Sequence, residues 1–220
     1  MEERKTVKLK KSEFEVKEYV KLTIGKGKFS RVGIEYTPVG EKIIIATHKP
    51  GLIIGRKGEM INDLTETLKK KFGLENPHIE IDEIKEPEFD AQIIADDLAL
   101  GLEKMGPLKF KVLAYKALQK IMGAGALGVE INLNGKLPSS RAKSWRFAQG
   151  YLKKTGDAAK VVDRAKSRAE TKPGTVGIKV SILSPHAIMK DRINITEKLL
   201  DTLKENSEKQ QNKPKKKLTE

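Results

Sequence analysis

Two glycines with an arginine and a lysine between them, Gly55-Arg56-Lys57-Gly58, are the residues of this 220-residue chain whose types and spacing best suit chemistry. Glycine has no Cβ atom, so another backbone can approach it closely. A helix that begins after Gly58 would offer unpaired N–H groups and the positive end of its dipole. Together with the charges of Arg56 and Lys57, these features predict a site for phosphate. The alternative is an ordinary tight turn, since two glycines at this spacing also occur by chance.

The residues on either side of this loop predict the elements that hold it. Ile53 and Ile54 belong to an apolar, β-branched run before the loop, which favours a strand. The apolar residues after the loop recur at helical spacing and lie on one face of a helix that ends at Gly73: Ile61, Leu64, Leu68 and Phe72. We therefore expect a strand-to-helix corner with a basic tip.

The positive charge of the chain is concentrated in one segment. Overall, 44 Lys and Arg stand against 30 Asp and Glu, a net charge of +14. Residues 107–181 alone hold 16 bases and 4 acids, a balance of +12, whereas residues 87–106 hold one base and five acids. Such a segment repels itself, and a polyanion is the usual reason to retain it. A solubility surface is the alternative, but mixed charges would serve solubility as well, so the charge favours nucleic acid.

Turn residues and hydrophobic spacing divide the chain into two α+β halves. An acidic stretch with Pro87 marks the boundary, which gives predicted domains over residues 1–86 and 87–190. Residues 191–220 are expected to form a short helix from Asn194 and a disordered, lysine-rich tail. The other predicted elements are helices over 12–22 (capped by Ser12), 59–72, 89–104 and 108–122, and strands over 31–37, 41–47, 78–84, 129–134, 141–151, 160–170 and 176–183.

The sequence offers little to an enzyme. The three histidines are far apart and lack the spacing of metal ligands, so no metal, cofactor or catalytic residue is predicted. Asp96 and Asp97 are adjacent on a predicted helix, so they point in different directions and make a poor acid–base pair. There is no cysteine, no apolar run approaches the roughly 20 residues of a membrane span, and the first residues lack a secretory signal. We expect a cytoplasmic chain without a membrane partner.

The loop and its flanks, IIGRKGEMINDL over residues 53–64, resemble the KH domain, whose glycine-containing loop clamps several nucleotides of single-stranded nucleic acid. A helix and two strands are predicted before the loop, and a helix and a strand after it. That order is similar to the prokaryotic-type (type II) KH domain. The resemblance implies that Gly55, Arg56, Lys57 and Gly58 bind RNA.

Three further segments resemble a single family: GVEINLNGKL over residues 128–137, RAKSWRFAQGYLKKTGD over 141–157 and GTVGIKVSI over 174–182. That family is the third protein of the small ribosomal subunit, the KH-domain protein of the subunit head, in its archaeal and eukaryotic form. The resemblance covers residues 5–185. It implies an α+β fold in which a type II KH domain precedes two helices and a four-stranded sheet. It also implies a structural role, with small-subunit ribosomal RNA and neighbouring head proteins as partners.

The same resemblance implies that the second helix of the C-terminal domain lines the mRNA entry channel. A gap-free match through Tyr115, Ile121 and Met122 places the family's adjacent basic pair on Lys111 and Val112, so the second base is missing here. The helix still carries four candidate RNA-binding lysines: Lys109, Lys111, Lys116 and Lys120. Three of them are predicted to form one stripe opposite the apolar face: Lys109, Lys116 and Lys120. Lys111 is predicted to point in another direction. A solvated helix face is the alternative for any one of them.

Three more bases, Arg141, Lys143 and Arg146, are candidate RNA-binding residues, since the alternation of a strand would place them mostly on one side. Two other functions stay open: a free KH-domain regulator that binds messages away from the ribosome, and a nuclease or lyase that acts through a lysine. A free regulator usually links several RNA modules, whereas this sequence has one KH loop.

Overall fold

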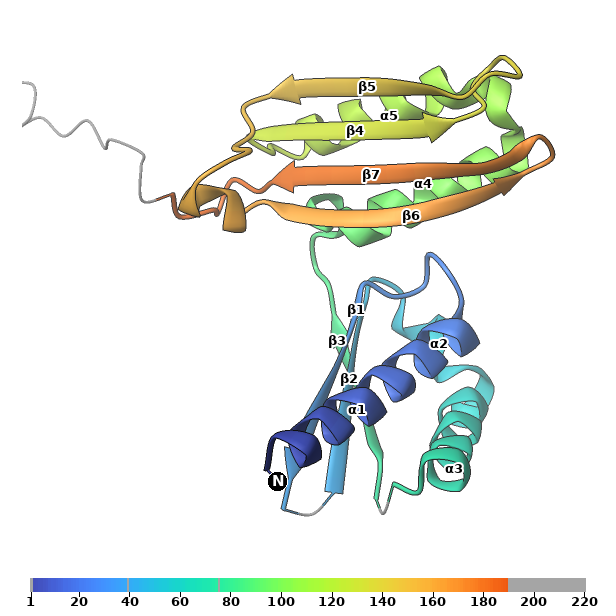
Figure 1. Ribbon diagram of the computed structural model, residues 1–220, viewed down its shortest axis with the longest axis vertical. Helices are drawn as coiled ribbons and strands as arrows, with labels where there is room; N and C mark the ends of the chain where they lie inside the picture. Colours follow the sequence, from blue (N-terminus) through green and yellow to red (C-terminus); the bar gives the residue numbers. More distant parts are fainter. Residues whose placement is uncertain (1, 39, 75, 190–220) are drawn as a thin grey trace, which may run out of the picture. The chain divides into compact units, whose positions relative to one another are not determined.

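The computed structural model describes residues 2–38, 40–74 and 76–189, and its N-terminal half holds three helices and three strands (Figure 1). The elements follow in the order α1 (Glu2–Ile24), β1 (Arg31–Thr37), β2 (Gly40–Thr47), α2 (Pro50–Ile54), α3 (Glu59–Phe72) and β3 (His78–Glu83). Strand β2 lies in the middle of the sheet, antiparallel to β1 and parallel to β3. The strands predicted over 31–37 and 41–47 and the helix predicted after Gly58 are confirmed.

A small apolar core joins the helices of this half to the middle strand. It is built from α1, β2 and α3, with one residue each from the loop before β1 and from α2: Val16, Val20, Ile24, Phe29, Ile43, Ile45, Ile53, Leu64 and Leu68. Strand β2 supplies most of the buried sheet residues because it has a neighbour on each side. Helix α3 ends at Gly73, whose positive φ of 62° stops the helix in the left-handed region that glycine favours.

Two predictions in this half are wrong. Helix α1 begins at Glu2, not at Ser12, and the Ser12 hydroxyl donates to the Leu9 carbonyl inside the helix. The residues before Ser12 are helix-forming Lys, Glu and Leu, which continue the helix without a cap. The predicted strand before the glycine loop is the short helix α2, which Pro50 opens at its first turn. Periodicity alone does not assign so short an apolar run.

The C-terminal half places two helices against a four-stranded antiparallel sheet. Its elements are α4 (Ala91–Met105), α5 (Phe110–Gly123), β4 (Gly128–Gly135), β5 (Lys143–Gly150), β6 (Asp163–Thr171) and β7 (Gly174–Leu183). The strand order is β5-β4-β7-β6. All four strands were predicted. Strand β4 ends with Asn134 and Gly135, and residues 136–142 connect it to β5.

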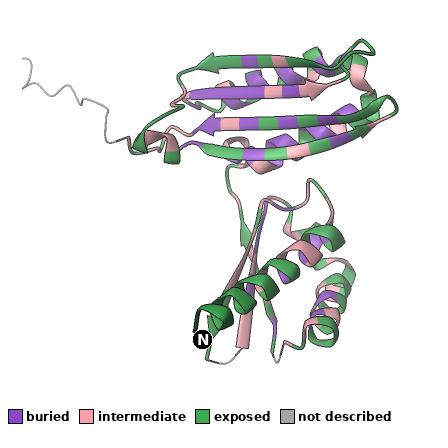
Figure 2. Cartoon of the chain, viewed as in Figure 1, coloured by how far each residue is buried: buried purple, intermediate pink, exposed green. Residues whose placement is uncertain are grey.

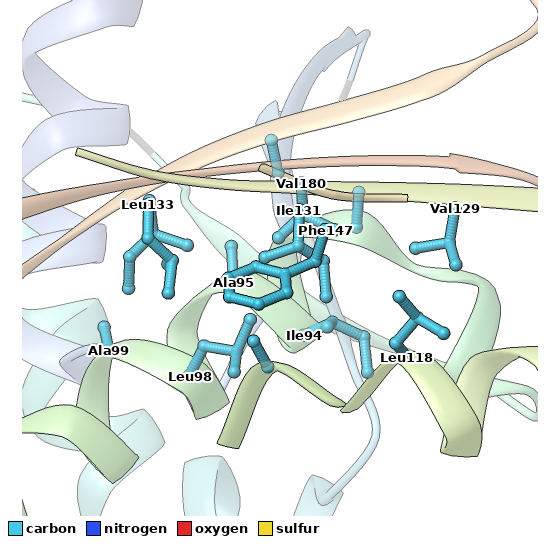
Figure 3. Close-up of a cluster of buried hydrophobic side chains, with 14 of the residues drawn as sticks. Ile94, Ala95, Leu98, Ala99, Leu118, Val129, Ile131, Leu133, Phe147 and Val180 are labelled. Atoms are coloured by element: carbon cyan, nitrogen blue, oxygen red, sulfur yellow. The ribbon is translucent and has the colours of Figure 1, made fainter. Parts of the chain in front are cut away.

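Helices α4 and α5 cover one face of this sheet and leave the other face open (Figure 1). Figure 3 shows Ile94 and Leu98 of α4 and Leu118 of α5 facing Ile131 of β4 and Val180 of β7. The helix-facing apolar residues of β4 and β7 alternate with residues that face away from the helices, as a pleated strand requires, although Glu130 of β4 and Leu183 at the end of β7 are buried as well. Strands β5 and β6 are therefore mostly exposed in Figure 2, apart from their helix-facing residues.

The α+β fold is thus confirmed, with a three-stranded sheet in the first half and a four-stranded sheet in the second. The two apolar clusters share no residue: one draws on residues 16–81 and the other on residues 89–182. On that ground we propose a domain boundary near residue 86, as the sequence predicted. The predicted helix from Asn194 and the tail lie outside the described residues.

The separate cores predict that residues 1–86 and residues 87–190 fold as independent fragments. Each should unfold in one cooperative thermal transition, followed by circular dichroism, because its buried residues contact one another. Both should melt a few degrees below the intact chain, since the Gly27 N–H donates to Asp96 at 3.2 Å and Ser30 donates to Asp90. An unfolded 1–86 fragment would contradict the boundary.

Candidate nucleic-acid interface

The loop from Gly55 to Gly58 adopts a backbone that depends on its glycines. Gly55 has a φ of 74° and Gly58 a φ of 80°, both in the region that side chains disfavour. A Cβ atom on Gly55 would also lie 2.6 Å from Cγ of Met60, whereas one on Gly58 would meet open space. Lys57 takes a positive φ of 54° without being glycine, so the surrounding turn holds it in an uncommon conformation.

This loop presents positive charge and free donors at one tip. Arg56 and Lys57 are exposed. Gly58 stands at the N-cap of α3 and has no side chain that accepts from the first N–H groups of the helix. The N–H of Glu59 donates to the Arg56 carbonyl within the turn. The N–H groups of the next residues of α3 and the positive end of the helix dipole point toward the loop. The combination suits a phosphate that approaches the backbone, as predicted for these four residues.

Exposed apolar side chains beside the loop were missed by the sequence reasoning. Leu52 and Ile54 of α2 and Met60 of α3 are between 37% and 50% exposed, although the neighbouring Ile53 is buried. A helix over this segment would place Leu52 and Ile54 on the two flanks of the buried Ile53, where both are open to solvent. Apolar surface next to cations gives the bases of a single strand something to pack against while its phosphates meet the charges.

The four lysines of the second helix do not share one environment. Lys120 forms an ion pair with Glu88 at 3.2 Å. The pKa of Glu88 is lowered, first by a hydrogen bond from its own backbone and then by Lys120. Lys111 lies over the Trp145 ring at 4.9 Å, so it points toward β5 and away from the others. Within the described part of the chain, Lys109 and Lys116 form no ion pair.

The position of the lysine stripe on α5 differs from the prediction. Lys116 and Lys120 line a groove of about 340 Å³ between α4 and α5, together with Leu113 and Ala117. The stripe thus flanks the buried face, and the exposed Val112, four residues before Lys116, lies beside the stripe on the side away from the core. The helical spacing was correct, but the apolar face reaches the stripe, because Leu113 lies next to it and packs partly buried against the core. Lys109 precedes α5, in the single 3-10 turn from Pro107 to Lys109.

The prediction for Arg141, Lys143 and Arg146 is wrong in its geometry. Arg141 lies in the turn before β5, not in the strand. Lys143 and Arg146 differ by an odd number of residues, so they stand on opposite faces of β5. Arg146 shares the open face with Glu130, to which it donates at 3.0 Å. The candidate residues therefore occupy separate places: the glycine loop, helix α5 with the turn before it, the turn before β5, and the two faces of β5.

Comparison with known proteins agrees with this geometry. Residues 15–89 match the model of the KH domain, and residues 100–182 match the model of the C-terminal domain of ribosomal protein S3. The small ribosomal subunit protein uS3 of Methanocaldococcus jannaschii is 40% identical over 198 residues, which cover 90% of this chain and 94% of that protein. The chain belongs to the uS3 family.

Other uS3 proteins are similar over most of their length. That of Methanococcus maripaludis strain C5 is 36% identical over 185 residues, 84% of this chain and 87% of the relative. That of Methanococcus aeolicus is 35% identical over 196 residues, which cover 89% of this chain and 93% of the relative. The uS3 family is a family of structural ribosomal proteins, so the predicted class and the absence of an enzymatic role are confirmed. No helix among the described residues is long and apolar enough to cross a membrane.

The loop geometry predicts a selective loss of single-stranded RNA binding when its charge is reversed. In the full chain, Arg56→Asp together with Lys57→Asp should weaken binding of a 20-nucleotide oligouridine at least about tenfold at low salt, because two phosphate contacts become repulsive. The slope of log affinity against log salt should fall by about 1.4. Fluorescence anisotropy over a salt series measures both quantities.

The matched control is Lys5→Asp with Lys8→Asp, which reverses two exposed charges on α1. This variant should bind the oligouridine nearly as the wild type does, and thermal unfolding should show that both variants are folded. Equal binding by the loop variant and the wild type would mean that the loop is a structural turn.

Proposed function

We propose that this chain is a structural constituent of the small ribosomal subunit, where it binds ribosomal RNA and lines the mRNA entry channel with the lysines of α5. Membership of the uS3 family supports the subunit, and the charge of residues 107–181 supports RNA as the main partner. Neighbouring proteins of the subunit head and a cytoplasmic location are part of the same proposal. The loop from Gly55 to Gly58 then binds RNA through its backbone donors and its two cations.

The observation that carries the channel assignment is a pair of lysines, one just before α5 and one on it, that form no ion pair with the described residues. Lys109 and Lys116 are exposed and form no ion pair with the described residues, so their charge is available to a second molecule. Lys116 also borders the α4–α5 groove, which gives an RNA strand a shallow track past the helix. A strand that moves through a channel needs contacts that ignore sequence, and lysine–phosphate contacts do so.

Two features of α5 reduce the strength with which its lysines are expected to bind an RNA strand. Val112 stands where the family's second adjacent base was matched, and its exposed apolar side chain attracts no phosphate. Lys120 already forms an ion pair with Glu88, and Lys111 a cation–π contact with the Trp145 ring, so both attract phosphate less strongly. We therefore assign the larger share of the effect to Lys109 and Lys116.

Neutralising the four lysines should impair translation and leave assembly intact. A chain with Lys109, Lys111, Lys116 and Lys120 replaced by Gln should enter small subunits near normally, since the proposed contacts are with the moving message. Ribosomes that carry it should slow on messages with a stable hairpin downstream and translate unstructured messages at nearly the normal rate. The double variant Lys109→Gln, Lys116→Gln should reproduce most of the defect.

The matched control replaces four exposed bases of α1, Arg4, Lys5, Lys8 and Lys11, by Gln. It makes the same change in charge, and ribosomes that carry it should translate structured and unstructured messages at the wild-type rates. Failure of the α5 variant to enter subunits would instead mean that these lysines hold ribosomal RNA. Equal rates on both kinds of message would mean that they merely solvate the helix.

A further inference from the structure

The open face of the four-stranded sheet gathers bases that the loop and helix α5 leave out. Arg146 of β5, Lys179 of β7 and Lys166 of β6 stand in one row across the sheet, with Asn132 of β4 between the first two. All of them face away from α4 and α5, because their strand neighbours are the helix-facing residues. Two more bases extend the cluster along β6: Arg164 and Arg168.

Two of these lysines are direct cross-strand partners. Lys166 of β6 pairs in register with Lys179 of β7. Like charges directly opposite each other in a sheet destabilise it. On strand β6, Lys166 also has Arg164 and Arg168 two residues away on the same face, about 6.6 Å from it along the strand. The fold thus keeps four cations close together at a cost in stability, which a bound polyanion would offset.

The acids of this face neutralise only part of that cluster, since Glu170 forms an exposed ion pair with Arg168 at 3.9 Å. Among the described strand residues, Glu130 and Glu170 are the acids that face the open side. Glu130 accepts from Arg146 at 3.0 Å and lies 2.8 Å from the Lys154 ammonium. Burial raises the pKa of Glu130, but hydrogen bonds from Lys154, Asn132 and Arg146 outweigh it and bring the pKa to about 2. Glu130 therefore stays charged and holds Arg146 in place, while Lys166 and Lys179 remain uncompensated.

The open face also has no exposed aromatic ring, among its described strand residues, on which an RNA base could stack. The aromatic residues in strands β4 to β7, Trp145 and Phe147 of β5, belong to the helix side of the sheet, where both pack against Phe110. Trp145 further donates its Nε1–H to the Leu137 carbonyl. Sheets that bind single-stranded RNA stack its bases on exposed aromatic rings, and this face has none among the described strand residues. Its chemistry is limited to phosphates and hydroxyl groups.

We infer that the open face of the sheet binds the phosphate backbone of double-helical RNA without reading its sequence. The contacts come from Arg164, Lys166 and Arg168 of β6, Lys179 of β7 and Arg146 of β5. The inference rests on the proposed function, since structured ribosomal RNA supplies such helices, and it adds the surface and the kind of RNA. Bases buried in duplex stacks leave the backbone as the accessible part, which is what a flat basic surface without aromatic rings recognises.

The test uses the full chain and two RNA probes: a 20-base-pair duplex and a 20-nucleotide oligouridine. The open-face variant carries Lys166→Gln, Arg168→Gln and Lys179→Gln. Its affinity for the duplex should fall at least tenfold near 100 mM salt, and the slope of log affinity against log salt should shrink by about 2 to 3. Its affinity for oligouridine should change less than about twofold, since the glycine loop is intact.

The matched control, Lys5→Gln with Lys8→Gln and Lys11→Gln, removes three exposed charges from α1 and should leave duplex binding nearly unchanged. Thermal unfolding of the open-face variant should occur at or above the wild-type temperature, because the Lys166–Lys179 repulsion is relieved. Unchanged duplex binding by the open-face variant would overturn the assignment. So would an equal loss by the control, or an equal loss for oligouridine.

Incorporation into small subunits separates this inference from the proposed function. If the wild-type chain binds the duplex through this face but does not sediment with small subunits at high salt, the proposed function fails and the surface assignment stands. If the wild type sediments with subunits and the open-face variant binds the duplex normally, the surface assignment fails. If that variant also fails to enter subunits, the face contacts an acidic protein.

Discussion

The alternation of side chains along the four strands of the second sheet is the constraint on which the basic open face of that sheet depends. Val129, Ile131 and Leu133 must lie under the helices, so Glu130 and Asn132 between them must face the other way. The same rule turns Lys179 outward between Ile178 and Val180. A register slip by one residue would bury these charges and expose the core, so the hydrophobic pattern also positions the basic face. The helices then carry the second basic surface on their own outer side.

The glycine loop of the first half depends on a different constraint, backbone conformation rather than alternation. Gly55 is crowded by Met60 and has a positive φ, so both sterics and backbone require glycine there. The chain therefore presents three surfaces with different chemistry: a loop with free N–H donors and nearby apolar side chains, a helix flank with two available lysines, and a flat basic sheet. Each suits a different form of RNA, namely a clamped single strand, a moving strand and a duplex.

The sequence predicted elements well where one signal was repeated several times. Helix α3 and strands β4 and β7 carry long periodic patterns, and all were correctly placed. The helix α2 was missed because five residues are too few for periodicity to separate helix from strand. The positions of charged side chains were harder to predict. The pairing of Lys120 with Glu88 joins residues 32 positions apart, and that of Arg146 with Glu130 crosses two strands. Neither contact is visible until the helices and strands are packed.

Crosslinking from three positions in assembled small subunits tests the division of surfaces most directly. The chain has no cysteine, so Lys57→Cys, Lys116→Cys and Lys166→Cys variants each accept one photoreactive group. Positions 57 and 166 should crosslink to ribosomal RNA whether or not a message is bound, with position 166 reaching a double-helical segment. Position 116 should crosslink to the message, and only in subunits that carry one. Crosslinks from position 116 to ribosomal RNA without any to message, or from position 166 to protein alone, would contradict the account.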